Sequence, residues 1–191
     1  MKLIETIKIK DGKIYNIFYH NKRCNRSRLE LFGEQQTIDL VEYITNYPKK
    51  GLFKCRILYN KDVISVEYIP YTINRNKSFK IVSSDIDYNH KYSNRDSLNR
   101  LKEVNSLYDE IIIEKDGLLT DTSIANIAFF DGKNWITPKR PLLKGTVRER
   151  LLDIKILIEK DITSNSIKKF SCFALMNAMI GFQIQSNIKI L

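Results

Sequence analysis

One acid, Asp121, stands in a polar stretch between two apolar segments, where a carboxylate could pair with a cation. Residues 110–114 are typical of a strand, a Lys-Asp-Gly turn follows at 115–117, and another strand is expected to begin near Asn126. These patterns predict that Asp121 lies in a loop between two buried strands, with few water molecules around it. A carboxylate in such surroundings suits a buried cation as its partner.

A second candidate for chemistry is Gly145-Thr146-Val147-Arg148, which is expected to open a helix. The first amides of a helix have no intrahelical partner and point towards an anion, and Gly145 permits a close approach. An acid for a cation and a helix start for an anion are two features that a phosphate-bearing heterocyclic cofactor requires. The residues alone also allow a plainer interpretation, in which Asp121 is an Asx-turn or N-cap acid and Thr146 only enters a helix.

The elements that must position these residues alternate between strands and helices. The first half is expected to form an antiparallel sheet with helices, an α+β arrangement. Its predicted elements are a hairpin of strands 3–9 and 14–19 around Asp11-Gly12, helices 20–32 and 38–45, a second hairpin of strands 53–59 and 63–70, and a strand 79–82.

Between residues 83 and 95 the composition turns polar, and we interpret this stretch as the connection between two lobes. The prediction is a smaller N-terminal lobe over residues 1–84 and a C-terminal lobe over residues 85–191. Beyond the strands near Asp121, the second lobe is expected to contain helices 97–105, 146–152 and 164–169 and strands 135–136, 154–158, 171–175 and 182–190.

Composition excludes several classes of protein. The 191 residues are 43% hydrophobic, which allows a sizeable core, and no apolar run is long enough for a membrane span. No signal-peptide pattern is present, so we expect a cytoplasmic protein that does not bind membranes. Three widely spaced cysteines without a CxxC pair and only two histidines argue against a metal site.

The net charge of +10 could indicate a nucleic-acid-binding protein. The basic residues are scattered, however, and no nucleic-acid-binding motif is present, so we favour a solvated basic surface and expect no nucleic-acid partner. A positive field that attracts small anionic substrates or a phosphorylated cofactor is compatible with this interpretation.

Six short motifs in the same order resemble one family, the class-IV aminotransferase-type enzymes of fold type IV, which use pyridoxal 5′-phosphate (PLP). The motifs cover nearly the whole chain. They are Ile4-Glu-Thr-Ile7, His20-Asn-Lys-Arg23, Lys91-Tyr-Ser-Asn-Arg95, Thr120-Asp-Thr-Ser-Ile-Ala-Asn-Ile127, Leu143-Lys-Gly-Thr-Val-Arg148 and Met176-Asn-Ala-Met179.

The resemblance implies a fold and a quaternary structure. The expected fold is a two-lobed α+β enzyme, with an N-terminal α/β sandwich lobe and a C-terminal β-barrel-like α+β lobe. Members of the family build the site between the lobes and near a two-fold partner, which implies a homodimer.

The resemblance also assigns roles to the residues that match the motifs. Lys91 would form the Schiff base with PLP and act as the general base, and Asp121 would pair with the protonated pyridine nitrogen. The phosphate would be held by Gly145, Thr146 and Val147, with Arg23 and the backbone near Asn177 as further contacts.

Substrate contacts are assigned to Thr6, Tyr92, Asn94 and Arg95. Arg95 could bind a substrate carboxylate or brace Asp121. The chain departs from the family pattern in three ways: Asp121 replaces a glutamate, Ala178 replaces a residue that often carries a hydroxyl group, and the first lobe is short.

The Lys91-x-x-Asn94-Arg95 segment is most similar to aminodeoxychorismate lyase, an enzyme of folate biosynthesis that releases pyruvate and forms 4-aminobenzoate. This lyase is therefore the favoured prediction, with a small anionic, amino-acid-like substrate. A class-IV aminotransferase for branched-chain or D-amino acids is the alternative. A protein that keeps PLP without turnover is a third hypothesis, motivated by the short first lobe and by Asp121 and Ala178.

Overall fold

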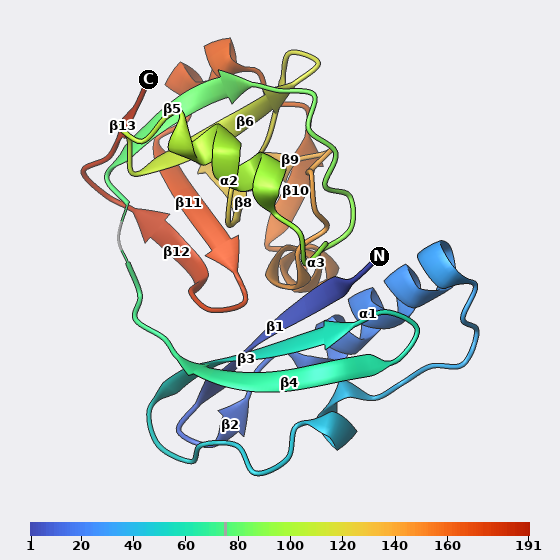
Figure 1. Cartoon of the computed structure of the whole chain (residues 1–191). Helices are drawn as coiled ribbons and strands as arrows, with labels where there is room; N and C mark the ends of the chain where they lie inside the picture. Colours follow the sequence, from blue (N-terminus) through green and yellow to red (C-terminus); the bar gives the residue numbers. More distant parts are fainter. Residues whose placement is uncertain (75) are drawn as a thin grey trace. The chain divides into compact units, whose positions relative to one another are not determined.

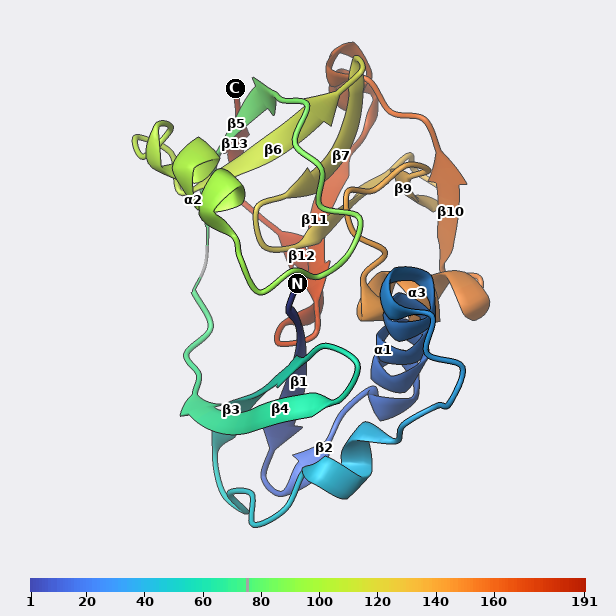
Figure 2. The same cartoon turned by 45° about the vertical axis from the view of Figure 1, so that its right-hand side comes forward.

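The computed structural model describes residues 1–74 and 76–191, and its elements form two compact units (Figures 1 and 2). Unit 1 contains Met1–Ile73 and His90–Asn94, and unit 2 contains Asn74–Asn89 and Arg95–Leu191. Strands and a few helices occur in both units, so the fold is α+β, as the sequence predicts. The division falls after Ile73, where the sequence suggested residues 84 and 85, because the chain enters unit 2 before the polar stretch and returns to unit 1 at His90.

Unit 1 is a four-stranded antiparallel sheet in the order β2-β1-β3-β4. Its elements are β1 (Leu3–Lys10), β2 (Lys13–Ile14), α1 (Ile17–Phe32), the 3-10 turn η1 (Leu40–Tyr43), β3 (Leu52–Tyr59) and β4 (Val63–Pro70). The returning segment 90–94 extends this sheet along β1, where the amide of Ile4 donates to the Lys91 carbonyl at 2.9 Å and Leu3 pairs with Tyr92.

Alternate residues of β1 and β3 build the core of unit 1. Leu3, Ile7 and Ile9 from β1 are buried together with Cys55 and Ile57 from β3, as the period of two in a strand requires. The helix α1 buries a mostly polar set instead of an apolar stripe. Its buried residues are His20, Arg23, Cys24, Ser27 and Arg28.

Two elements expected in unit 1 are wrong. The return strand 14–19 ends at Ile14, because Asn16 takes a left-handed conformation (φ 57°) and α1 begins at Ile17. The helix 38–45 is only the single turn η1, because side chains of α1 bind its backbone: Asn25 bonds both the amide and the carbonyl of Ile38, and Asn21 accepts from the amide of Leu40.

Unit 2 contains a nine-stranded mixed sheet. The path β10-β9-β8-β7-β6-β5-β13 is joined by β11, which pairs with β8 and β12. The strands are β5 (Ser78–Ser83), β6 (Glu110–Lys115), β7 (Leu118–Thr122), β8 (Asn126–Phe130), β9 (Trp135–Pro138), β10 (Leu157–Lys160), β11 (Cys172–Asn177), β12 (Gly181–Gln185) and β13 (Lys189–Ile190). The helices are α2 (Asp96–Glu103), α3 (Thr146–Asp153) and the 3-10 helix η2 (Ser164–Lys169).

Strand β8 is the centre of unit 2. It pairs with β7 at Asn126, with β9 at Phe129 and Phe130, and with β11 along its whole length. Its residues Ile127 and Phe129 are buried in a core that includes Phe79, Ile112 and Phe173, and Ala128 is buried in a second cluster with Val147. Asn126, the first residue of β8, therefore pairs with Asp121 of β7 and with Met176 of β11, so its position beside Asp121 is fixed from both edges of the strand.

Three expectations for unit 2 need correction. Asp121 lies in strand β7 and not in a loop, because the chain pairs with β6 through Thr122 and reverses only after it. The strand predicted over 154–158 begins only at Leu157 and continues to Lys160 as β10, and the strand predicted over 182–190 is divided into β12 and β13.

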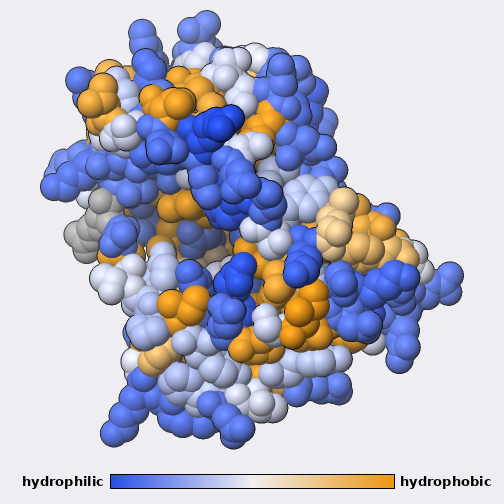
Figure 3. Space-filling model, viewed as in Figure 1, coloured by the Kyte–Doolittle hydropathy of each residue, from blue (hydrophilic) through white to orange (hydrophobic). Residues whose placement is uncertain are grey.

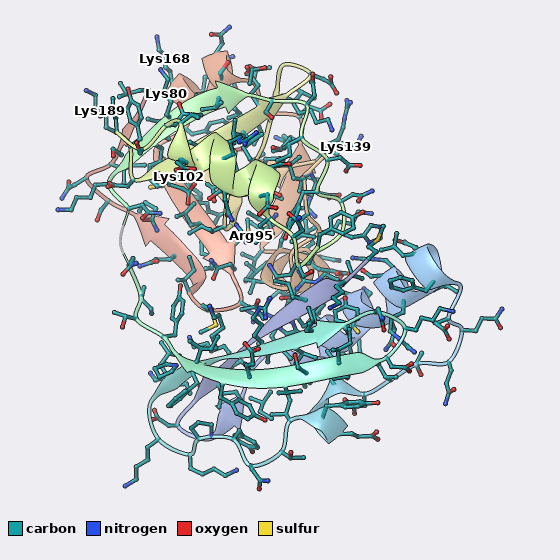
Figure 4. All side chains as sticks on the ribbon, in the orientation of Figure 1. Lys80, Arg95, Lys102, Lys139, Lys168 and Lys189 are labelled. Carbon is teal, nitrogen blue, oxygen red and sulfur yellow. The ribbon has the colours of Figure 1, made fainter. Side chains whose placement is uncertain are left out.

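The surface in the view of Figure 3 is largely hydrophilic, interrupted by apolar patches. Within unit 2, Lys80 and Lys189 lie on the side away from Lys139 (Figure 4), so these basic residues do not form one continuous block. Among residues 1–74 and 76–191, no helix combines the length and the apolar character needed to cross a bilayer.

Candidate active site

Asp121 is buried in unit 2 and accepts hydrogen bonds on both carboxylate oxygens. The Asn126 side-chain amide donates to Oδ1 at 2.7 Å, and the backbone amide of Leu143 donates to Oδ2 at 2.9 Å. Only 4% of the residue is exposed. Burial raises the pKa of Asp121 to about 6, although these two donors and the charge of Arg148 act to lower it.

Asn126 was not singled out by the sequence, but it holds the acid. It is the first residue of β8 and lies directly opposite Asp121 across a tight turn in which the Thr122 amide donates to the Ala125 carbonyl at 2.9 Å. Side chains of directly opposed residues lie on the same face, about 5 Å apart at Cβ. An Asp and an Asn flanking a short turn are the signal that could have revealed this pair.

The helix α3 begins where the sequence predicts it. Gly145 is its N-cap in an extended conformation (φ −72°, ψ 145°), and no side chain of a described residue caps it. Thr146 and Val147 follow as its first two residues and are buried. A side chain at position 145 would place Cβ 1.9 Å from the Asn126 Oδ1, so the lack of a side chain at Gly145 is required by space.

Arg148 also belongs to this half of the site. Its side chain is buried, and Nη2 donates to the Pro138 carbonyl at 2.8 Å and to Glu159 at 2.6 Å. Its positive charge lowers the pKa of Asp121, against the larger effect of burial. Arg148 is thus a buried cation of unit 2 that acts on Asp121.

Lys91 is carried by the segment 90–94 of unit 1, which pairs with β1. The Lys91 carbonyl accepts from Ile4, and the amide of Ser93 donates to the Lys2 carbonyl at 3.0 Å, so two backbone bonds around Tyr92 hold the segment against residues 2–4. The side chain is half-buried, as is its neighbour Tyr92, whereas Asn94 is exposed.

Glu5 of β1 forms a buried ionic network with His20 and Arg23 of α1. The Glu5 carboxylate accepts from Arg23 Nε at 2.8 Å and Nη2 at 2.6 Å, and it bonds the Nδ1 atom of His20 at 2.5 Å. Burial alone would raise the pKa of Glu5, but the Arg23 charge and the His20 bond hold it at about 2. Arg23, predicted as a phosphate contact, is thus a buried residue in bidentate contact with Glu5.

Lys91 lies within electrostatic reach of this network. Burial lowers the pKa of His20, Glu5 acts to raise it, and the charges of Arg23 and Lys91 lower it further. Lys91 and this network therefore interact electrostatically within unit 1.

Three predicted site residues have contacts that define them more closely. Arg95 Nη2 donates to the Ser123 carbonyl at 2.7 Å, which braces the turn after Asp121. The Asn177 side chain accepts from the amides of Met179 and Ile180 and so closes the turn between β11 and β12. Thr6 is half-buried on the face of β1 opposite Glu5.

The residues of unit 2 fit PLP. A buried carboxylate, the uncapped start of a helix and a turn whose glycine cannot be replaced without a clash are the elements that a pyridine ring with a phosphate requires. Asp121 would hold the ring nitrogen, and Gly145, Thr146 and Val147 would hold the phosphate.

Comparisons with known proteins identify the family. Residues 2–188 match the model of the amino-transferase class IV family. A Haemophilus influenzae protein of uncharacterised function is 37% identical over 185 residues, which is 94% of this chain and 98% of the relative. A crystal structure from Haemophilus somnus, provisionally named a 4-amino-4-deoxychorismate lyase, is 38% identical, with a TM-score of 0.86 over 94% of this chain and 97% of that one.

A third relative from Schizosaccharomyces pombe, provisionally named an aminodeoxychorismate lyase, is 30% identical over 115 residues, which is 53% of this chain and 50% of the relative. The chain belongs to the amino-transferase class IV family. It is therefore a PLP-dependent enzyme, a lyase or an aminotransferase. The chain covers almost the full length of both Haemophilus relatives.

Proposed function

We propose that this enzyme is a 4-amino-4-deoxychorismate lyase, which releases pyruvate from its substrate and forms 4-aminobenzoate. The observation that carries the proposal is the 38% identity, over nearly the full length of both chains, to the Haemophilus somnus protein that bears this provisional name. The motif Lys91-x-x-Asn94-Arg95 supports the same assignment. Since 4-aminobenzoate is a building block of folate, the enzyme would serve folate biosynthesis.

The reaction needs a base at one carbon of the substrate. A proton leaves the ring carbon that bears the amino group, its electrons form a ring double bond, and the C–O bond to the enolpyruvyl group breaks. The departing enolate takes up a proton on its methylene carbon and becomes pyruvate, while the ring becomes aromatic. PLP, when bound, supplies an electron sink for the amine-bearing carbon.

Different residues of the chain are proposed to bind the cofactor, to transfer the proton and to contact the substrate. Lys91 would attach the cofactor covalently, and its freed amine would then take the proton from the amine-bearing carbon. Asp121 would keep the ring nitrogen protonated, which strengthens electron withdrawal. The start of α3 would anchor the phosphate, with Arg23 as a further positive charge. Thr6, Tyr92, Asn94 and Arg95 are proposed to contact the substrate.

A direct test combines the visible spectrum with product analysis. The protein incubated with PLP should be yellow and should release pyruvate and 4-aminobenzoate from 4-amino-4-deoxychorismate. Lys91→Ala should abolish both properties, while Lys115→Ala, which removes a half-buried lysine bonded to the Ile86 carbonyl, should keep both.

Two results would overturn the proposal. Conversion of the bound cofactor to its pyridoxamine form by amino acids, without pyruvate release from the lyase substrate, would identify an aminotransferase. A yellow protein that turns over neither class of substrate would identify a protein that binds PLP without catalysis.

We also propose that the enzyme acts in the cytoplasm as a homodimer, as the family resemblance implies. Sedimentation equilibrium at micromolar concentration measures the mass directly. A particle with the mass of one 22.4 kDa chain at all concentrations would refute the dimer.

A further inference from the structure

The amide group of Asn126 connects two parts of unit 2 that the proposed function uses separately. One N–H of Nδ2 donates to the Asp121 carboxylate at 2.7 Å, and the other donates to the Leu143 carbonyl at 2.8 Å. The amide of Leu143 in turn donates to the second oxygen of Asp121 at 2.9 Å. The acid and the turn that leads into α3 are thus joined in a closed ring of hydrogen bonds.

The chemistry of asparagine suits this position. A carboxamide provides two donors in one plane, and both are used here. An aspartate would bring no donor, and an alanine would leave Asp121 Oδ1 and the Leu143 carbonyl without this partner. The remaining atom of the amide, Oδ1, fills the space that a side chain on Gly145 would need, because a Cβ there would lie 1.9 Å from it.

The consequence for Asp121 is both geometric and electrostatic. Burial favours a neutral carboxyl group, and a neutral carboxyl group cannot form an ion pair with a pyridinium. Donors to the carboxylate favour its charged form, and hydrogen bonds to charged groups are stronger than those to neutral groups. Asn126 therefore opposes the effect of burial while it fixes the direction of the carboxylate.

We propose that Asn126 is a positioning residue for cofactor binding: its amide holds the Asp121 carboxylate and the 143–145 turn in one arrangement, so that the acid meets the ring nitrogen charged and correctly aimed. The proposal rests on the proposed role of Asp121. Asn126 does not touch the reacting atoms and acts only through its two neighbours.

A double-mutant cycle on PLP affinity separates this role from a general structural one. The apparent dissociation constant of PLP is measured by absorbance titration of the apo-protein for the wild type, Asn126→Ala, Asp121→Ala and the double variant. Asn126→Ala should weaken binding about ten-fold in the wild-type background. In the Asp121→Ala background the same change should weaken binding less than about two-fold.

Thr137→Val is the matched control. Thr137 is fully buried in the same unit, and its hydroxyl donates to the Ile127 carbonyl of β8 at 2.8 Å, next to Asn126 in the chain. The change removes a buried hydrogen bond of similar length without reaching Asp121, so PLP affinity should stay within about two-fold of the wild type.

Each outcome of the cycle supports or overturns the positioning role of Asn126. An equal loss in both backgrounds would show that Asn126 acts without Asp121, and an unchanged affinity in Asn126→Ala would show that it has no role; either result overturns the inference. If Asp121→Ala binds PLP like the wild type, the proposed role of Asp121 fails first, and the inference fails with it.

Should Asn126→Ala not fold, Asn126→Asp keeps the shape of the side chain and gives an independent readout. The introduced carboxylate has no donor and repels Asp121 when charged, but it regains a donor when protonated. Its PLP affinity relative to the wild type should therefore be lower at about pH 8 than at about pH 5.5. The same deficit at both pH values would contradict the inference.

Discussion

Replacement of Asp121 by asparagine should change how the stability of the apo-protein depends on pH. Burial raises the pKa of this carboxyl from 3.8 to about 6. Between these values the folded protein binds more protons at Asp121 than the unfolded chain does, so the free energy of unfolding falls as the pH rises. The stabilisation by the protonated form is complete below about pH 4 and is lost as the pH passes through about 6.

The magnitude follows from the two pKa values. A difference of about two pH units corresponds to about 3 kcal/mol in the free energy of unfolding. Asp121→Asn cannot titrate, so it should lack this fall of about 3 kcal/mol between about pH 4 and about pH 7.5. The substitution also places an amide N–H against one of the two donors, and this cost is the same at every pH.

Urea unfolding of the apo-protein at closely spaced pH values measures both curves. The other titrating groups are common to the two proteins, so the difference between the curves isolates position 121. Asp85→Asn, which replaces an exposed aspartate of unit 2, is the control and should run parallel to the wild type. If Asp121→Asn also runs parallel to the wild type, the burial argument for this acid is refuted.

Three further predictions concern the network in unit 1 and the turn before α3. Arg23→Met should destabilise the protein by about 3–5 kcal/mol, measured by urea unfolding at neutral pH, because it leaves the buried Glu5 carboxylate without its cation. Stability that depends on Glu5 should be lost as the pH falls from about 4.5 to about 2, an acid limb of about 3 kcal/mol that Glu5→Gln should lack; an identical acid limb in that variant would be the contrary result. Gly145→Ala should weaken PLP binding at least about ten-fold, because its Cβ would displace the Asn126 amide, whereas the exposed neighbour Lys144→Ala should bind PLP like the wild type.

The sequence predicts most elements of the fold because local signals suffice for them. The hairpin of β3 and β4 follows from two alternating segments around an Asn-Lys-Asp turn, and α3 follows from its glycine start. The helix predicted over 38–45 is wrong because side chains of α1, 13 and 19 residues away in the sequence, accept hydrogen bonds from the backbone of this segment. No local pattern contains that information.

In the candidate site, too, contacts between residues that are distant in the sequence could not be predicted. Motif order predicted roles for Lys91, Asp121 and the start of α3; Asp121 lies near the end of β7, and Gly145 is the N-cap of α3. It did not show that Arg23 forms a bidentate contact with Glu5, because the polar face of α1 is indistinguishable from a solvated one until β1 lies against it. The same holds for Asn126, whose importance arises only from the register of β7 and β8.

The path of the chain has a consequence for protein engineering. The backbone passes between the units three times, after Ile73, after Asn89 and after Asn94. A chimera with a relative that is joined after Ile73 would therefore combine the β1 strand of one parent with the Lys91 segment of the other. Domain exchange in this enzyme needs two further junctions, so that the five residues 90–94 travel with the sheet they complete.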